Sequence, residues 1–168
     1  GVALNHISAM SYADGVLTCS DALSKQGISI QTKLVISAAG IFTDEFLEGF
    51  VEDFTPVMKP SKGVHLVIDG SRFPDRDVIL IPAEDDRFLW ICPWVDGLAL
   101  LGATDTPFHG DLQEPGVTGE DVDYILRNCN RYLQGIELLP SDILSSYSGL
   151  RPLLDEEGED DTVKVSRD

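Results

Sequence analysis

Two arginines near the end of the printed sequence have the side chains best suited to bind an anion. Arg151 in "SGLRPLL" and Arg167 in "VSRD" stand on either side of an acidic run, Asp155–Asp161. If this run is the loop of an antiparallel hairpin, facing residues have a constant sum of numbers, and Arg151 and Arg167 face each other around position 159. Alternation along each strand then places both on a hydrophobic side of the hairpin.

Two facing guanidinium groups require a negative partner. Like charges directly opposite each other destabilise a sheet, and burying them unpaired costs several kcal/mol per ion. The partner is either one of the 29 acidic residues of the chain or a bound phosphate or carboxylate, which a guanidinium binds through two parallel hydrogen bonds. Geometry alone favours a carboxylate of the protein.

A histidine and a short polar segment are the other candidates for chemistry. An imidazole such as that of His65 accepts a proton near neutral pH, but a lone histidine on a strand is more often a packed core residue. Thr104, Asp105 and Thr106 either line a site or form a turn that their own side chains stabilise. The three histidines and three cysteines lack metal-ligand spacing, so no metal site is expected.

Short strands must position these residues. Alternating apolar side chains predict a strand over residues 62–69, with Val64, Leu66 and Ile68 on one face and His65 on the other. An Asp96-Gly97 hairpin is expected between two apolar runs. The other predicted strands cover residues 16–20, 28–30, 34–40, 77–83, 87–94, 149–154 and 163–167.

Two helices complete the expected α+β architecture. The first covers residues 43–54 and is capped by Thr43. The second covers residues 118–133 and is capped by Thr118, with acidic residues in its first turn. Its apolar stripe contains Val122, Ile125, Leu126, Cys129, Tyr132 and Leu133.

Composition excludes several classes of function. The chain has 168 residues, 43% of them hydrophobic, and a net charge of −17, which suits one domain or one and a half. The negative charge argues against binding to nucleic acid and to anionic membranes. No apolar run approaches the roughly 20 residues of a spanning helix. Three widely spaced cysteines are expected to be reduced, which indicates a cytoplasmic location.

Seven segments in this order resemble one family. They are "VISAAG", "PSKGVHLVI", "ILIPAEDDRFLWICPW", "LLGATDTPFHGD", "TGEDVDYILRNCNRYL", "SGLRPLL" and "VSRD". The resemblance is to the FAD-dependent glycerol-3-phosphate dehydrogenases of the respiratory, aerobic type, which pass electrons to quinone, and to the related α-glycerophosphate oxidases, which pass them to oxygen. It implies a middle fragment of such an enzyme, because the G-x-G-x-x-G loop that binds the FAD pyrophosphate is absent.

The resemblance also implies a domain organisation. Residues 1–55 correspond to part of the FAD domain, and residues 56–168 to a truncated, antiparallel substrate-binding domain of the D-amino-acid-oxidase type. Ala39 and Gly40 fall where the family's chain passes close to FAD, although on sequence alone tight strand-to-helix packing is the better explanation of such small residues. FAD is expected in the longer parent and not on the isolated fragment. Ala103 replaces a threonine of the family's usual "GTTDT" pattern.

Substrate-site roles follow from the same resemblance. Arg151 and Arg167 are expected to bind sn-glycerol 3-phosphate, most of all its phosphate, and His65 is expected to accept the proton of the C2 hydroxyl. Lys62 adds positive charge, and Thr104 is a further substrate-binding residue. The implied reaction gives dihydroxyacetone phosphate, with quinone as the electron acceptor of the parent.

Two other interpretations stay open at this point. One is another FAD-dependent oxidase, acting on amines or amino acids. The other, from a different class, is an acidic interaction module without a cofactor, which the acidic run and the missing glycine-rich loop support. For a glycerol-3-phosphate dehydrogenase, membrane contact is expected only through parts outside this chain. The parent enzyme is then expected to be cytoplasmic and peripheral on the inner membrane.

Overall fold

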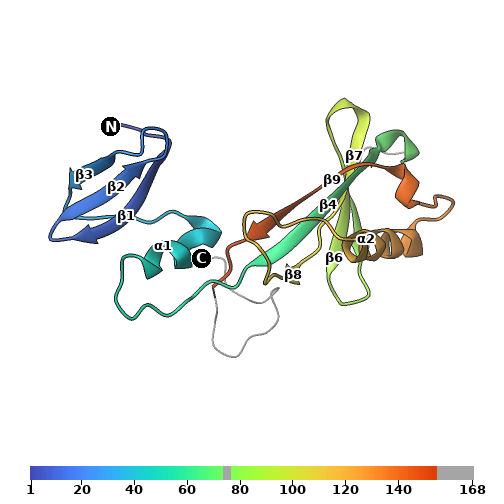
Figure 1. The fold of residues 1–168 in the computed structure, drawn as a ribbon. Coiled ribbons are helices and arrows are strands. Elements are labelled where there is room, and N and C mark those ends of the chain that lie inside the picture. The colour runs from blue at the N-terminus through green and yellow to red at the C-terminus, as the bar shows by residue number, and fades with distance from the viewer. Residues whose placement is uncertain (74–76, 155–168) are drawn as a thin grey trace. The chain divides into compact units, whose positions relative to one another are not determined.

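The computed structural model of the chain describes residues 1–73 and 77–154. Its contacts divide the chain into two compact units, Gly1–Met58 and Lys59–Asp168 (Figure 1).

Unit 1 contains a three-stranded antiparallel sheet in the order β1-β2-β3. The sequence predicted β2 (Val16–Asp21) and β3 (Gly27–Gln31), but it missed β1 (Ile7–Ala13). The turn between β1 and β2 contains Asp14 and Gly15, both with positive φ, at 51° and 77°. An Asp-Gly pair between two runs is a strong hairpin signal, so the missed strand had a sequence marker.

The predicted strand over residues 34–40 is wrong. This segment has no strand structure, and Leu34 and Ile36 are 69% and 80% exposed. A strand that is buried on both faces needs a pairing strand on each side and covering layers above and below. Within the described residues, no strand pairs with this segment, so its apolar side chains have nothing to pack against.

The first helix is shorter than predicted. Helix α1 covers Thr43–Glu48 and ends at Gly49, a residue that disfavours helix continuation. Thr43 is not its cap: the helix begins after Phe42, and the Thr43 hydroxyl donates to the carbonyl of Gly40 over 2.7 Å.

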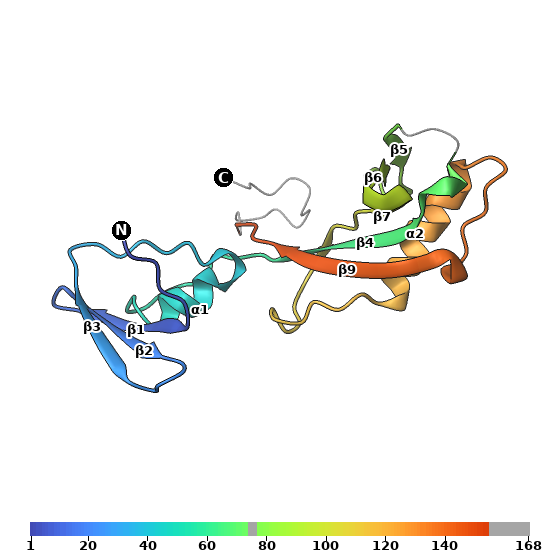
Figure 2. The same cartoon turned by 90° about the horizontal axis from the view of Figure 1, so that it is seen from above.

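Unit 2 contains an antiparallel sheet in the order β5-β6-β7-β4-β8, with β9 on the other side of β4. The predicted α+β fold is confirmed. Figure 2 shows β9 running beside β4 along its length. The strands are β4 (Ser61–Asp69), β5 (Ile79–Pro82), β6 (Phe88–Pro93), β7 (Leu98–Gly102), β8 (Thr106–Pro107) and β9 (Ile143–Arg151).

The core of unit 2 lies between one face of this sheet and helix α2 (Gly119–Tyr132). Alternation along β4 is confirmed, since Val64, Leu66 and Ile68 are fully buried and belong to the same hydrophobic core as the helix. The side of α2 that enters the core carries Ile125, Leu126 and Cys129. No helix within residues 1–73 and 77–154 is long and apolar enough to cross a membrane.

The ends of α2 agree with the sequence in part. Thr118 forms the predicted N-cap, and Asp121 completes a capping box. Tyr132 was wrongly assigned to the apolar stripe: it is 46% exposed. It is the last residue of the helix, and its ring lies 5.7 Å from the guanidinium carbon of Arg131.

Two loop predictions have different outcomes. The β6–β7 hairpin is confirmed, with Asp96 and Gly97 at φ values of 57° and 75°. The segment of Thr104, Asp105 and Thr106, expected either to line a site or to form a turn, leads into strand β8, where Thr106 pairs with Lys62.

The last predicted hairpin is only partly within the described residues. Strand β9 starts at Ile143 and not at Gly149, and it pairs with β4 throughout. The first half of the strand was not predicted because its polar stretch "SSYS" lacks the alternation of apolar residues that indicates a strand. The predicted partner strand 163–167, with Arg167, lies outside the described residues.

Candidate functional site

The face of β4 opposite α2 brings together two of the predicted site residues. Ser61 pairs with Arg151 across β4 and β9, and His65 pairs with Tyr147. Residues at positions i and i+2 of a strand share a face, so His65 and Arg151 lie on the same side of the sheet with Gly63 between them. We call this side the open face of unit 2.

The guanidinium of Arg151 is held by backbone and by one acid. Nη1 and Nη2 both donate to the carbonyl of Thr104, each over 3.2 Å. Nη1 also lies 3.7 Å from Oδ1 of Asp105, which is longer than a hydrogen bond. The carboxylate partner that the charge argument required is therefore present but loosely paired, and the side chain stays 31% exposed. An anion can still bind to this fork.

A glycine makes room for that arrangement. A β-carbon at Gly63 would come within 2.6 Å of Nη2 and 2.9 Å of the guanidinium carbon of Arg151. The guanidinium therefore lies directly over the β4 backbone. Any larger residue at this position would displace it from Thr104.

Thr104 acts through its backbone. Its side chain is buried, and its hydroxyl accepts a hydrogen bond from the Val64 amide over 3.0 Å and donates to the Lys62 carbonyl over 3.3 Å. These bonds fix the segment after β7 against β4. The backbone carbonyl of Thr104 is thereby placed to accept hydrogen bonds from Arg151 and to orient its guanidinium.

The Asp105 carboxylate is held in the same way. It accepts a hydrogen bond from the hydroxyl of Ser61, and the carbonyl of the same residue accepts one from Arg87. Asp105 is therefore fixed close to Arg151 by Ser61 on β4 and by Arg87, the residue before β6.

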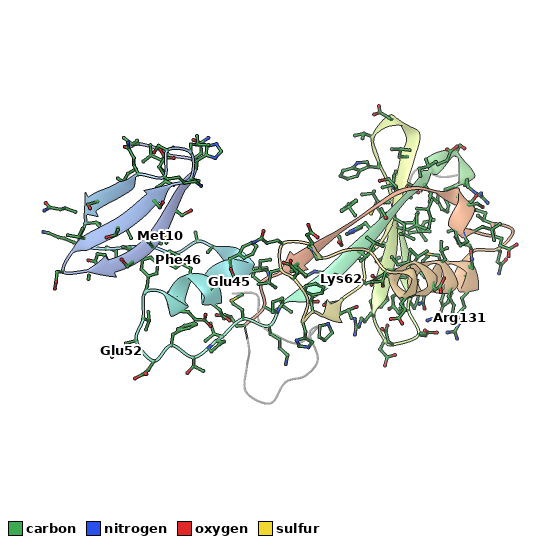
Figure 3. The ribbon with its side chains drawn as sticks, viewed as in Figure 1. Met10, Glu45, Phe46, Glu52, Lys62 and Arg131 are labelled. Atoms are coloured by element: carbon green, nitrogen blue, oxygen red, sulfur yellow. The ribbon has the colours of Figure 1, made fainter. Side chains whose placement is uncertain are left out.

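Lys62 faces the other way from Arg151. Figure 3 labels the Lys62 side chain on β4. Its Nζ lies 2.6 Å from Oδ2 of Asp121 and 3.3 Å from the Gly116 carbonyl, and both charged side chains are buried. Burial raises the pKa of Asp121, but hydrogen bonds from Lys62 and Thr118 and the charge of Lys62 outweigh it and hold the pKa below 3.8. The lysine thus joins β4 to the start of α2.

His65 lies between two neighbouring strands. Its ring stacks on that of Tyr147, with centroids 5.1 Å apart and planes 13° apart. Burial lowers the pKa of His65 below its ordinary 6.5, and the positive charge of Arg151 lowers the pKa further. The imidazole is therefore neutral, and able to accept a proton, over a wider pH range than an exposed one.

The two residues predicted to contact FAD belong to unit 1. Gly40 has a φ of 59° and is exposed, and a β-carbon there would have nothing within 4 Å. Ala39 is half-buried beside it. A group can approach the backbone here, so these residues fit a single contact with FAD. They do not form its whole binding site, because the sequence lacks a pyrophosphate-binding loop.

A cavity of about 380 Å³ in unit 2 is separate from the open face. Its lining includes Ile79, Ile91 and Ala99, which belong to the core side of the sheet. None of the predicted site residues lines it.

Comparison with known proteins decides the family. The model of the FAD dependent oxidoreductase family matches residues 6–164 of this chain. The chain belongs to this family. The membership of an FAD-dependent oxidoreductase family that the seven segments predicted is confirmed, and a cofactor-free interaction module is not supported.

Two curated relatives and one solved structure narrow the likeness. An α-glycerophosphate oxidase of Streptococcus pyogenes is 41% identical over 138 residues, which is 80% of this chain and 22% of that protein. The mitochondrial glycerol-3-phosphate dehydrogenase of Mus musculus is 34% identical over 151 residues, which is 89% of this chain and 20% of that protein. The glycerol-3-phosphate dehydrogenase of Bacillus halodurans complexed with FAD is 36% identical, with a TM-score of 0.79 over 92% of this chain and 32% of that one.

The chain thus spans about a fifth of the length of these curated relatives. Within it, sequence reasoning found His65 and Arg151 but missed Tyr147 and Asp105 as their neighbours. Tyr147 carries no motif, and its position beside His65 depends on the register between β4 and β9.

Proposed function

We propose that the protein containing this chain oxidises sn-glycerol 3-phosphate to dihydroxyacetone phosphate and uses FAD. The relatives named for this substrate support the proposal. The observation that carries it is the open face, where a cation and a neutral base lie on one side of the β4–β9 pair. Residues 1–55 contribute to the FAD domain, and residues 56–168 form the substrate-binding domain.

Arg151 binds the substrate phosphate in this proposal. Its N–H groups that do not face Thr104 form two parallel hydrogen bonds to phosphate oxygens. The Asp105 carboxylate lies 3.7 Å from the guanidinium. At this distance it helps to orient the guanidinium and leaves N–H groups available to the phosphate. Arg167 is proposed as a second phosphate ligand. Lys62 is given no substrate contact because it is paired with Asp121, and Thr104 contributes by orienting Arg151.

His65 is the proposed base. The C2 hydroxyl of the substrate donates its proton to the neutral imidazole, which burial keeps unprotonated. When bound, FAD supplies the hydride acceptor for the C2 hydrogen. Ala39 and Gly40 would lie against FAD through their backbone. Binding of the phosphate at Arg151, away from C2, orients the reacting carbon.

The electron acceptor and location complete the proposal. Quinone accepts the electrons, and the protein is cytoplasmic and peripheral on the inner membrane. Oxygen is the second candidate acceptor, because one of the most similar relatives is named an oxidase. Substrate-dependent formation of hydrogen peroxide without added quinone would favour oxygen.

The test compares glycerol 3-phosphate with glycerol in the full-length, FAD-loaded protein. We expect turnover of the phosphate ester and a strong preference for it in kcat/KM. The substitution Arg151→Ala should remove most of that preference, because it deletes the phosphate contact. Arg131→Ala, on the exposed end of α2, is the matched control and should leave it unchanged. Absence of turnover with glycerol 3-phosphate would overturn the proposal.

A further inference from the structure

Tyr147 lies where it can control the base of the reaction. It pairs with His65 across β4 and β9, and the two rings stack nearly parallel. We infer that Tyr147 is a positioning residue that holds the His65 imidazole in the orientation needed to accept the substrate proton. This inference rests on the proposed role of His65.

The opposite neighbour of His65 lets the imidazole lie close against the β7 backbone. On β7, Gly102 pairs with His65, and a β-carbon there would lie 2.9 Å from Cδ2 of the imidazole. Gly102 has a φ of 156°, and a side chain would also come within 2.6 Å of the Val64 carbonyl oxygen. The imidazole therefore lies between a tyrosine ring on one strand and a bare backbone on the other. Rotation of the ring is restricted from both sides.

The same stacking excludes water from one face of the imidazole. Tyr147 is itself 48% exposed, and its ring stacks on the imidazole, so loss of the ring would uncover that face of His65. The neighbours of His65 on β4 and β7 are uncharged, and the charged group that faces it is Arg151 on β9. Since burial is the larger cause of the lowered pKa, removal of the tyrosine ring should let water reach His65 and raise its pKa.

The hydroxyl of Tyr147 is not needed for this role. Within residues 1–73 and 77–154 it makes no side-chain hydrogen bond, and its ring provides the contact. Phenylalanine should therefore replace tyrosine, whereas alanine should not. This contrast separates ring stacking from chemistry at the hydroxyl.

The experiment measures kcat, kcat/KM as a function of pH, and thermal unfolding for full-length Tyr147→Phe and Tyr147→Ala proteins. Misplacement of a reacting group lowers the rate by up to about a hundredfold. We expect Tyr147→Ala to lower kcat about tenfold or more and to move the acidic limb of the kcat/KM profile to higher pH. Tyr147→Phe should keep the wild-type kcat and the wild-type position of the acidic limb. Tyr132→Ala, which removes a similarly exposed ring from α2, is the matched control.

Each outcome decides one statement. If Tyr147→Ala lowers only the melting temperature and leaves the acidic limb of the kcat/KM profile unchanged, the inference about Tyr147 is overturned. The proposed role of His65 as the base then still stands. Near-normal turnover of a folded His65→Ala protein overturns the proposed role of His65 itself. The pKa of His65 from the NMR titration of its imidazole, assigned by its absence in His65→Ala, gives a readout independent of activity.

Discussion

The two faces of strand β4 use their polar residues in opposite ways. On the core face, Lys62 is buried in an ion pair with Asp121 of α2, beside the fully buried Val64 and Leu66. On the open face, His65 is half-buried, and Arg151 on β9 keeps about a third of its side chain exposed. One strand thus separates charge that holds the fold from charge that can bind a ligand. A positive residue in a site-like motif is not by itself a ligand-binding residue.

The largest effect is expected on the open face. We expect His65→Ala to lower kcat by roughly 10²–10⁴-fold with a smaller change in KM, because a general base contributes that much to a proton transfer. The melting temperature should change little. Steady-state kinetics and a melting curve of the full-length variant check this, and a large loss of stability with normal turnover would instead assign His65 to the core.

The core face should show the opposite behaviour. Lys62→Met leaves the buried carboxylate of Asp121 without its partner, and breaking a buried pair costs about 3–5 kcal/mol. We expect this loss in the free energy of unfolding, measured in urea, while KM for glycerol 3-phosphate stays unchanged in the folded fraction.

The double variant Lys62→Met, Asp121→Leu is the control for this prediction. It replaces the whole pair by apolar groups, which is often neutral, and it should recover much of the lost stability. A rise in KM in either variant would mean that Lys62 contacts the substrate after all.

A conservative change at Arg151 tests the shape of its contact. Arg151→Lys keeps the charge but loses the planar fork. A charge-assisted hydrogen bond contributes roughly 1.5–3 kcal/mol, so kcat/KM should fall about tenfold or more. Arg127→Lys, at an exposed ion pair with Glu84, should change nothing. Equal kinetics of the Arg151→Lys and wild-type proteins would show that charge alone is sufficient.

The smallest effect concerns acid stability on the core face. The pKa of Asp121 is lower in the folded protein than its ordinary 3.8, so its contribution to stability is present above that pH and is lost as the pH falls through the folded pKa. We expect the difference in unfolding free energy between the wild-type protein and Asp121→Asn to shrink below about pH 4. A difference that is constant from pH 7 to 3 would contradict this linkage.

Local patterns determined much of unit 2 from the sequence. The alternation of Val64, Leu66 and Ile68 fixed both the strand and the face that enters the core. The capping residues of α2 and the Asp96-Gly97 turn were also readable, because each depends on residues a few positions apart. The same local signals failed over residues 34–40, where an apolar run has no partner strand in the described residues.

Tertiary structure alone decided the surroundings of the site residues. Lys62 and Asp121 are 59 residues apart, and no spacing rule joins them. Tyr147 meets His65 only because β9 pairs with β4 in one register, and a shift of one residue would move every side chain of β9 to the other face. The sequence determined the family and the residue types at the site. The packing of distant segments decided which of those charges are buried in pairs and which stay partly exposed on the open face.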